Sequence, residues 1–124
     1  MSAEPTPPLP LTTAEFQILL SLAGGERHGY AIMQDAAAAT QGKLHLGPGT
    51  LYRSIKGLLA RGLIAESGER PDPALDDERR RYYRLTDLGR RAAESEAAHL
   101  AELVAQASAR LGLSWEPVAP QGGR

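Results

Sequence analysis

Helix-breaking residues divide the first half of this chain into short segments. They occur at four points: Gly24-Gly25, Gly42, Gly47-Pro48 and Gly62. Glycine commonly ends a helix because it adopts the left-handed C-cap conformation, and proline is tolerated in a first helical turn. The pattern predicts three short helices, over about residues 12–23, 28–40 and 48–61.

The segment 12–23 begins with a capping box, because Glu15 stands three residues after Thr12. Its apolar residues lie on two faces. One face carries Phe16, Leu19, Leu20 and Ala23, and the second carries Ile18 and Leu22. A helix with two apolar faces is either deeply buried or shared with a partner chain.

The other two segments each have one apolar stripe. In 28–40, Tyr30, Met33 and Ala37 are expected to face inward. In 48–61, the core stripe at helical spacing is Leu51, Ile55, Leu58 and Leu59. The opposite face of 48–61 holds small and basic residues, Gly49, Arg53, Lys56, Gly57 and Ala60, and the stripe is flanked by Thr50 and Tyr52.

Two segments after Gly62 have the composition of strands. Residues 63–66 and 79–85 are expected to pair in an antiparallel ribbon, with a proline-containing loop between them. This loop is acidic and would repel an anionic partner, so we expect contact with any such partner at the arginine-rich base of the ribbon. Residues 43–46 alternate between polar and apolar and are compatible with one more short strand.

The last helix is longer than a small core requires. Thr86 is a suitable N-cap, and a helix over 87–111 would be about 37 Å long at about 1.5 Å per residue. Its first half is only weakly apolar, so it needs something to pack against. The proline-rich residues 1–10 and the Pro/Gly-rich residues 113–124 are expected to be mobile tails.

Composition excludes several classes of protein. The chain has 124 residues, enough for one domain, and it has no cysteine for disulfides or thiolate zinc sites. His28, His45 and His99 fit no metal spacing, so we expect neither a metal nor a cofactor. No apolar run is long enough to cross a membrane and the N-terminus does not resemble a signal peptide, which makes a cytoplasmic protein the expectation.

An enzyme is not expected either. The Gly47-Pro48-Gly49-Thr50 turn lacks the lysine of a phosphate-binding loop, and no nucleophile elbow is present. The formal net charge is −1, but residues 43–91 carry eleven bases against seven acids. A basic middle segment suits an anionic partner.

Three short helices followed by a ribbon have the order of a winged helix-turn-helix. We therefore expect a mainly α fold with a small β-ribbon: a DNA-binding domain over 11–86 and a long last helix over 87–112 that needs a packing partner. A helix enters the major groove when one face packs on its own domain and the other offers small, polar and basic groups. Segment 48–61 meets this description, and the DNA-binding candidates from the residues alone are Gly49, Thr50, Tyr52, Arg53, Lys56, Arg79, Arg80 and Arg81.

Three stretches, HGYAIMQD (28–35), LGPGTLYRSIKGLLARGLI (46–64) and RRRYYRLTDLGRR (79–91), resemble the PadR family of bacterial transcriptional regulators. The resemblance covers about residues 11–92. It implies a homodimeric repressor that binds a palindromic operator and is released by a small-molecule inducer. It also implies that GTLY (49–52) opens the recognition helix and that His28 starts a helix whose N-terminus meets a phosphate.

The family further implies that the last helix packs with the first helix of the partner. The dimerisation candidates are Phe16, Ile18, Leu22, Leu88, Ala92, His99, Leu100, Leu103, Val104, Ala107 and Leu111.

Other interpretations of these residues remain open. Arg79–Arg81 could be a solvated strand end paired with the acids before it, and Tyr52 could be purely a core-edge aromatic. The last helix could fold back on its own domain. The alternative function is a winged-helix protein–protein interaction module without DNA binding, which would expose apolar residues on the outer face of 48–61.

Overall fold

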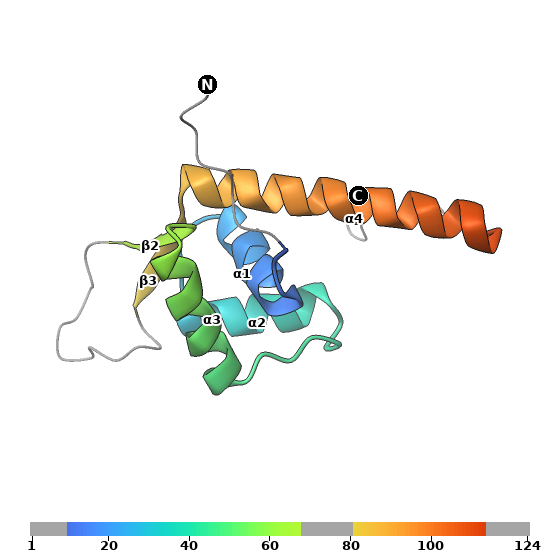
Figure 1. The fold of residues 1–124 in the computed structure, drawn as a ribbon. Helices are drawn as coiled ribbons and strands as arrows, with labels where there is room; N and C mark the ends of the chain where they lie inside the picture. The colour runs from blue at the N-terminus through green and yellow to red at the C-terminus, as the bar shows by residue number, and fades with distance from the viewer. Residues whose placement is uncertain (1–9, 68–80, 114–124) are drawn as a thin grey trace, which may run out of the picture.

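The computed structural model describes residues 10–67 and 81–113, which form a helical domain with a small sheet and one long helix. The elements follow in the order α1 (Thr13–Ala23), β1 (Arg27–His28), α2 (Gly29–Ala39), α3 (Pro48–Ala60), β2 (Ile64–Glu66), β3 (Tyr82–Leu85) and α4 (Asp87–Leu111). α1 packs against α2, α3 and α4, so it lies at the centre of the protomer (Figure 1). Each predicted helix begins and ends within two residues of its expected bounds.

Helix α1 begins with the predicted capping box. The Thr12 side chain accepts the Glu15 N–H at 3.0 Å, and the Glu15 carboxylate accepts the Thr12 N–H at 2.9 Å. The first turn of a helix has four backbone N–H groups without an intrahelical partner, and the capping box satisfies two of them.

The two apolar faces of α1 are used differently from our expectation. Ile18 and Leu22 are buried in the protomer core, while Leu20 is 44% exposed and Ala23 is also exposed. Both faces are apolar, so periodicity alone does not say which one meets α2 and α3. The prediction that Ile18 and Leu22 face a partner chain is wrong, because these side chains are enclosed by their own domain.

Helix α2 keeps the predicted orientation only in part: Met33 packs against the core and Ala37 is half-buried, as expected. Its buried residues are Gly29, Ile32 and Ala36, and Tyr30, expected to pack inward, is 51% exposed. The core stripe is therefore displaced from the one that we inferred, because the alanine run gives helical propensity without marking a face.

The α2–α3 connection keeps the predicted alternation of burial without forming a strand. Leu46 is buried and Leu44 half-buried, whereas Lys43 and His45 are exposed. The Thr40 hydroxyl holds the start of this loop by accepting the Leu44 N–H at 2.9 Å. The third strand of the sheet is instead β1, whose two residues are too few to show a period.

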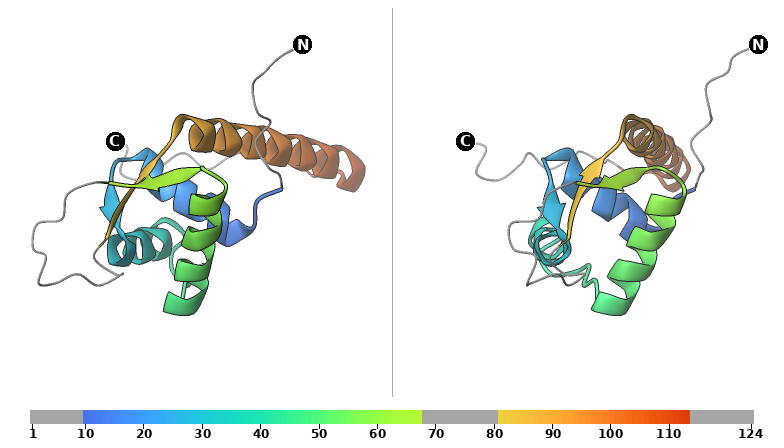
Figure 2. Two further views of the ribbon diagram at one scale, coloured as in Figure 1. Left: turned by 60° about the vertical axis from the view of Figure 1, so that its left-hand side comes forward. Right: turned by 90° about the vertical axis from the view of Figure 1, so that its left-hand side faces the viewer.

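The sheet has the order β1-β3-β2, with β3 antiparallel to both neighbours. Tyr83 of β3 stands opposite Arg27 on one side and Glu66 on the other, and its side chain is buried. β2 follows α3 directly, so the sheet lies at the C-terminal end of α3 (Figure 2). The predicted ribbon over 63–66 and 79–85 is thus present as β2 and β3; residues 68–80 lie outside the described ranges, as do residues 1–9 and 114–124.

The junction between the sheet and α4 is tightly packed. The Thr86 hydroxyl accepts the Gly89 N–H at 3.0 Å and donates to the Gly62 carbonyl at 2.7 Å. At Gly89, any side chain would collide with the backbone of Leu63, whose carbonyl accepts the Thr86 N–H at 3.2 Å. Only glycine allows α4 to start this close to the end of α3.

Helix α4 extends well beyond the rest of the domain (Figures 1 and 2). Its buried residues, Gly89, Ala92 and Glu96, all lie in its first half. The helix ends at Gly112, whose φ of 68° gives a left-handed C-cap. Among the described residues, no helix is long and apolar enough to cross a membrane.

Candidate nucleic-acid interface

Helix α3 has one face in the core and one face in solvent. Leu51, Ile55 and Leu58 are buried. Pro48 occupies the first turn, where its missing N–H has no intrahelical partner to lose. The exposed residues of the helix include the predicted Gly49, Thr50, Arg53 and Lys56. The folded structure therefore buries the apolar face of α3 and exposes the face with small and basic residues.

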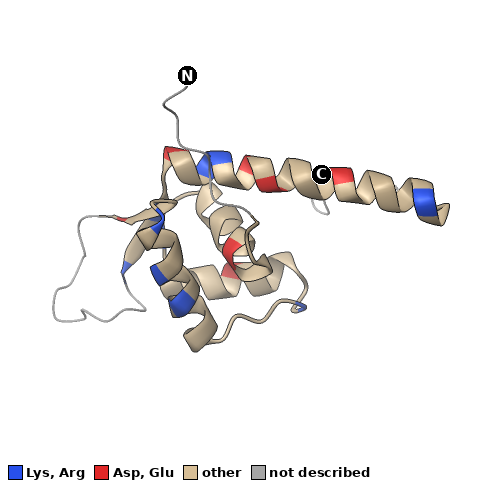
Figure 3. Cartoon of the chain, in the orientation of Figure 1, with Lys and Arg blue, Asp and Glu red and all other residues tan. Residues whose placement is uncertain are grey.

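The exposed face of α3 is cationic and has little bulk. Arg53 and Lys56 are both exposed, and Figure 3 marks the basic positions of α3 in blue. Arg53 is close to Thr50, with Nη2 at 3.5 Å from the hydroxyl oxygen, and Lys56 follows one turn later. A Cβ at Gly49 would meet nothing within 4 Å. Of the large apolar side chains exposed in the described residues, none lies on α3.

Tyr52 occupies a different position from the one predicted for a DNA contact. Its hydroxyl is buried, and a Cβ added at Gly29 would lie 2.5 Å from that oxygen. The ring therefore packs over the first residue of α2. This position suits Tyr52 for holding α3 against α2, and it favours the alternative in which Tyr52 is a core-edge aromatic over its selection as a DNA contact.

His28 caps α2 at the side of the sheet. Its Nδ1 accepts the Ala31 N–H at 3.1 Å, and its ring meets Tyr82 of β3 edge-on, with the ring centroids 5.4 Å apart. Since Nδ1 is an acceptor, the neutral imidazole carries its proton on Nε2. His28 thus joins α2 to the sheet, and its half-buried ring leaves it one possible donor for an anion.

The base of the ribbon contributes further arginines. Arg81 forms an ion pair with Glu66 across the strands, with 3.3 Å between Nη1 and Oε2 and both side chains about two-fifths exposed. Arg79 and Arg80 lie outside the described residues. Arg84 on β3 is exposed as well and was not among our predicted site residues. The alternation of the strand, which buries Tyr83, is the sequence signal that could have identified it.

The candidate dimerisation residues separate into two groups. Ala92 is buried within the protomer, which corrects its assignment to the partner-facing surface, and Phe16 and Leu88 are half-buried against the core. His99 is exposed. The exposed apolar side chains of α4 lie in its distal half: Leu100 (38%), Leu103 (45%), Val104 (42%) and Leu111 (69%).

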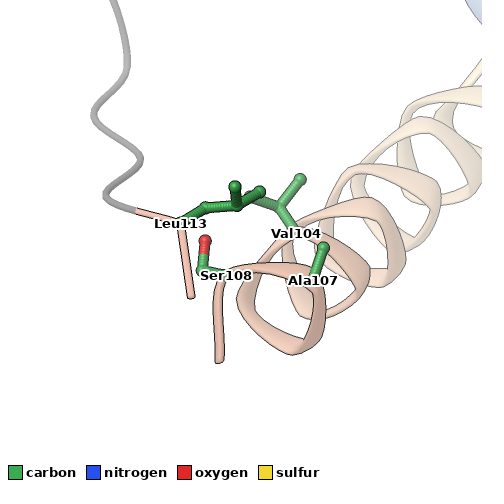
Figure 4. A pocket seen from close by; sticks show the side chains of 4 residues that line it. All are labelled: Val104, Ala107, Ser108 and Leu113. Atoms are coloured by element: carbon green, nitrogen blue, oxygen red, sulfur yellow. The ribbon is translucent and has the colours of Figure 1, made fainter. Parts of the chain in front are cut away.

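The end of α4 also carries a small apolar hollow of about 210 Å³. Figure 4 shows its lining residues, Val104, Ala107, Ser108 and Leu113. Leu113 is turned back over the helix by the Gly112 cap, and its N–H donates to the Ser108 carbonyl at 2.9 Å. No cluster of His, Cys, Asp or Glu suited to a metal ion exists among the described residues.

Comparison with known proteins agrees with this geometry. Solved structures of similar fold include a transcriptional regulator from Clostridium thermocellum, with a TM-score of 0.65 and 24% identity over 78% of this chain and 87% of that one. A PadR family regulator from Clostridium difficile has a TM-score of 0.66 and 21% identity over 81% of this chain and 99% of that one. A PadR-like transcription factor from Bacteroides fragilis has a TM-score of 0.62 and 26% identity over 76% and 85%.

A curated relative, an uncharacterised 37.1 kDa protein in transposon TN4556 of Streptomyces fradiae, is 37% identical over 90 residues. These residues are 73% of this chain but 24% of that protein, so the chain spans about a quarter of its relative's length. The family model of the PadR-like transcriptional regulators matches residues 18–95. This match takes in the second half of α1, all of α2, α3 and the sheet, and the first nine of the 25 residues of α4. The chain therefore belongs to the PadR-like family of transcriptional regulators.

Proposed function

We propose that this regulator binds an inverted-repeat DNA operator as a homodimer, with α3 of each protomer in the major groove. The observation that carries the proposal is the two-sided character of α3. Its apolar stripe is fully used inside the domain, and its other face presents Thr50, Arg53 and Lys56 without any large apolar side chain. The same observation disfavours a protein-binding winged helix, which would need an apolar outer face.

The chemistry of this face suits the edge of a base pair and its flanking phosphates. An arginine guanidinium can bond guanine through two donors, and a lysine neutralises a phosphate. Arg81, directly before β3, and Arg84 on β3 would supply further cations at the flanking backbone. Each neutralised phosphate releases counterions, so affinity should fall steeply as salt concentration rises.

The homodimer is inferred from the distal half of α4. The buried stripe Gly89, Ala92 and Glu96 continues at helical spacing as Leu100 and Leu103, but there the helix has passed beyond the domain. An identical helix from a second protomer would cover this stripe with matching residues, as a twofold axis requires. The face of α1 with Phe16, Leu20 and Ala23 is a second apolar surface that a partner helix could cover.

The dimer is tested by a charge placed on the stripe. Leu103→Glu should convert the protein to monomers in sedimentation, because the carboxylate would be buried against the partner helix. Ala98→Glu is the matched control, since Ala98 is exposed and lies on the opposite side of α4. A Leu103→Glu protein that sediments as the same dimer as Ala98→Glu would remove the distal half of α4 from the interface.

Operator binding is tested by selecting bound fragments from random DNA at several salt concentrations. Inverted repeats with half-sites about one helical turn, roughly 34–36 Å, apart should be enriched. Fragments without shared sequence would contradict the proposal.

We also infer repression and release by a small-molecule inducer, both from the family resemblance. A reporter carrying the selected operator should be silenced by the protein, and a screen of small molecules should find one that dissociates the complex. Activation of the reporter would reverse the sign of the regulation.

A further inference from the structure

A series of hydrogen bonds connects α4 to the start of α1. Glu96 of α4 is only 5% exposed, and its Oε1 accepts the Leu11 N–H at 3.4 Å. Leu11 is itself buried, so the backbone at this point is fixed from both sides. The next N–H along the chain, that of Thr12, donates to Oε1 of Glu15 at 2.9 Å.

The series continues from Glu15 to α3. The second carboxylate oxygen of Glu15, Oε2, pairs with Nη2 of Arg61, the residue that caps the C-terminus of α3. The Arg61 Nε donates to the carbonyl of Gly57, one turn earlier in α3, at 3.2 Å. The two charged side chains are 14% and 30% exposed, so water screens this pair less than an exposed surface pair.

We propose that Glu15 is a positioning residue that fixes the recognition helix α3 relative to the dimerisation helix α4. The inference rests on the proposed function, in which α4 joins two protomers and α3 of each enters the DNA. The separation of the two α3 helices then depends on how α4 is attached to each domain. Glu15 joins the two parts of the series, because its Oε1 accepts the Thr12 N–H next to Leu11 and its Oε2 pairs with Arg61 at the C-terminus of α3.

The Glu96–Leu11 bond is the point at which to break the series. At 3.4 Å it is the longest of these bonds and it lies farthest from α3. Glu96→Met removes the acceptor at similar volume, whereas Glu96→Gln keeps an Oε1 that can accept the same N–H. Glu94→Met removes an exposed carboxylate from the same helix and is the matched control.

The first measurement is hydrogen exchange of the full chain without DNA. Glu96→Met should increase exchange at the amides of residues 57–61 by about fivefold relative to those of α2, the low end of typical coupling between sites. Glu96→Gln and Glu94→Met should leave this ratio unchanged. A uniform increase in all elements, or none at α3, would overturn the proposal, because it would show loss of stability alone.

The second measurement uses the selected operator and versions with one or two base pairs added between the half-sites. Glu96→Met should bind the altered spacings with a smaller penalty than wild type, by about fivefold, while affinity for a single half-site stays the same. Arg61→Lys, which keeps the charge but has no Nε to bond Gly57, should act likewise. Unchanged spacing discrimination in both variants would overturn the inference. Wild-type protein that binds no DNA would instead refute the proposed function, and the exchange experiment would still judge the connection.

Discussion

A methyl group added at Gly89 should destabilise the protein by pushing α4 away from the end of α3. The new Cβ would overlap the Leu63 carbonyl oxygen and lie 2.9 Å from its carbon and 3.0 Å from Cδ1 of Leu85. The nearest obstacle is backbone, so it cannot be relieved by a change of rotamer. Either α4 or the 61–63 turn must move.

The size of the effect follows from three contributions. Overpacking of this kind costs about 1–3 kcal/mol. Moving the Leu63 carbonyl weakens its 3.2 Å bond with the Thr86 N–H, worth about 1 kcal/mol. Alanine returns about 0.5–1 kcal/mol through helix propensity. We therefore expect Gly89→Ala to lower the free energy of unfolding by about 1–3 kcal/mol.

The assay is urea denaturation at one fixed protein concentration, because a dimer gains stability with concentration. Gly57→Ala is the control: it is the same substitution within a helix, but its Cβ would make only ordinary contacts at 3.7 and 3.9 Å. That variant should be more stable than wild type by about 0.5–1 kcal/mol. A Gly89→Ala protein as stable as Gly57→Ala would refute the tight packing of this junction.

Two further predictions concern the contacts that hold α3 and α4 in place. Thr86→Ala should lower the free energy of unfolding by about 1–2 kcal/mol, because the hydroxyl caps α4 and also donates to the Gly62 carbonyl. Thr86→Ser, which keeps the hydroxyl, should stay near wild type. An equal loss of stability in both variants would mean that the hydroxyl contributes nothing. Gly29→Ala should lower the free energy of unfolding by about 1–2 kcal/mol, because the new methyl group collides with the Tyr52 hydroxyl. In a double-mutant cycle, Tyr52→Phe should recover part of this loss. Strictly additive effects of the two substitutions would show that the two residues are not in tight contact.

The bounds of the helices could be predicted because the signals that set them are local. A capping box at Thr12, a proline at the start of α3 and glycines after α3 and α4 each act within a few residues. The buried stripe of α3 could also be predicted from the sequence, because only one face of this helix is apolar.

The orientation of α1 and α2 could not be predicted in the same way. Leu20 and Ile18 are both apolar and lie on different faces of α1, and the choice between them is made by what α2 and α3 bring to the core. Tyr30 was misplaced because the alanine run of α2 does not mark which face turns to the core. The Tyr52 hydroxyl was assigned to DNA because Gly29, the residue that makes room for it, is distant in sequence.

The interaction of Glu15 with Arg61 could not be predicted from the sequence either. Glu15 was recognised as a capping residue, which explains one of its two oxygens. Its second partner is 46 residues away. Periodicity and capping rules describe neighbours along the chain, so long-range pairs of this kind require the fold.

The most direct test of the exposed face of α3 is the affinity of single variants for the selected operator. Arg53→Ala should weaken binding by about 1–3 kcal/mol, and Lys56→Ala should weaken it on all sequences while lowering the salt dependence by about one counterion. Lys43→Ala, which removes an equally exposed cation from the α2–α3 loop, should bind as wild type at the same thermal stability. If Arg53→Ala and Lys56→Ala both bind as tightly as Lys43→Ala, α3 does not enter the groove.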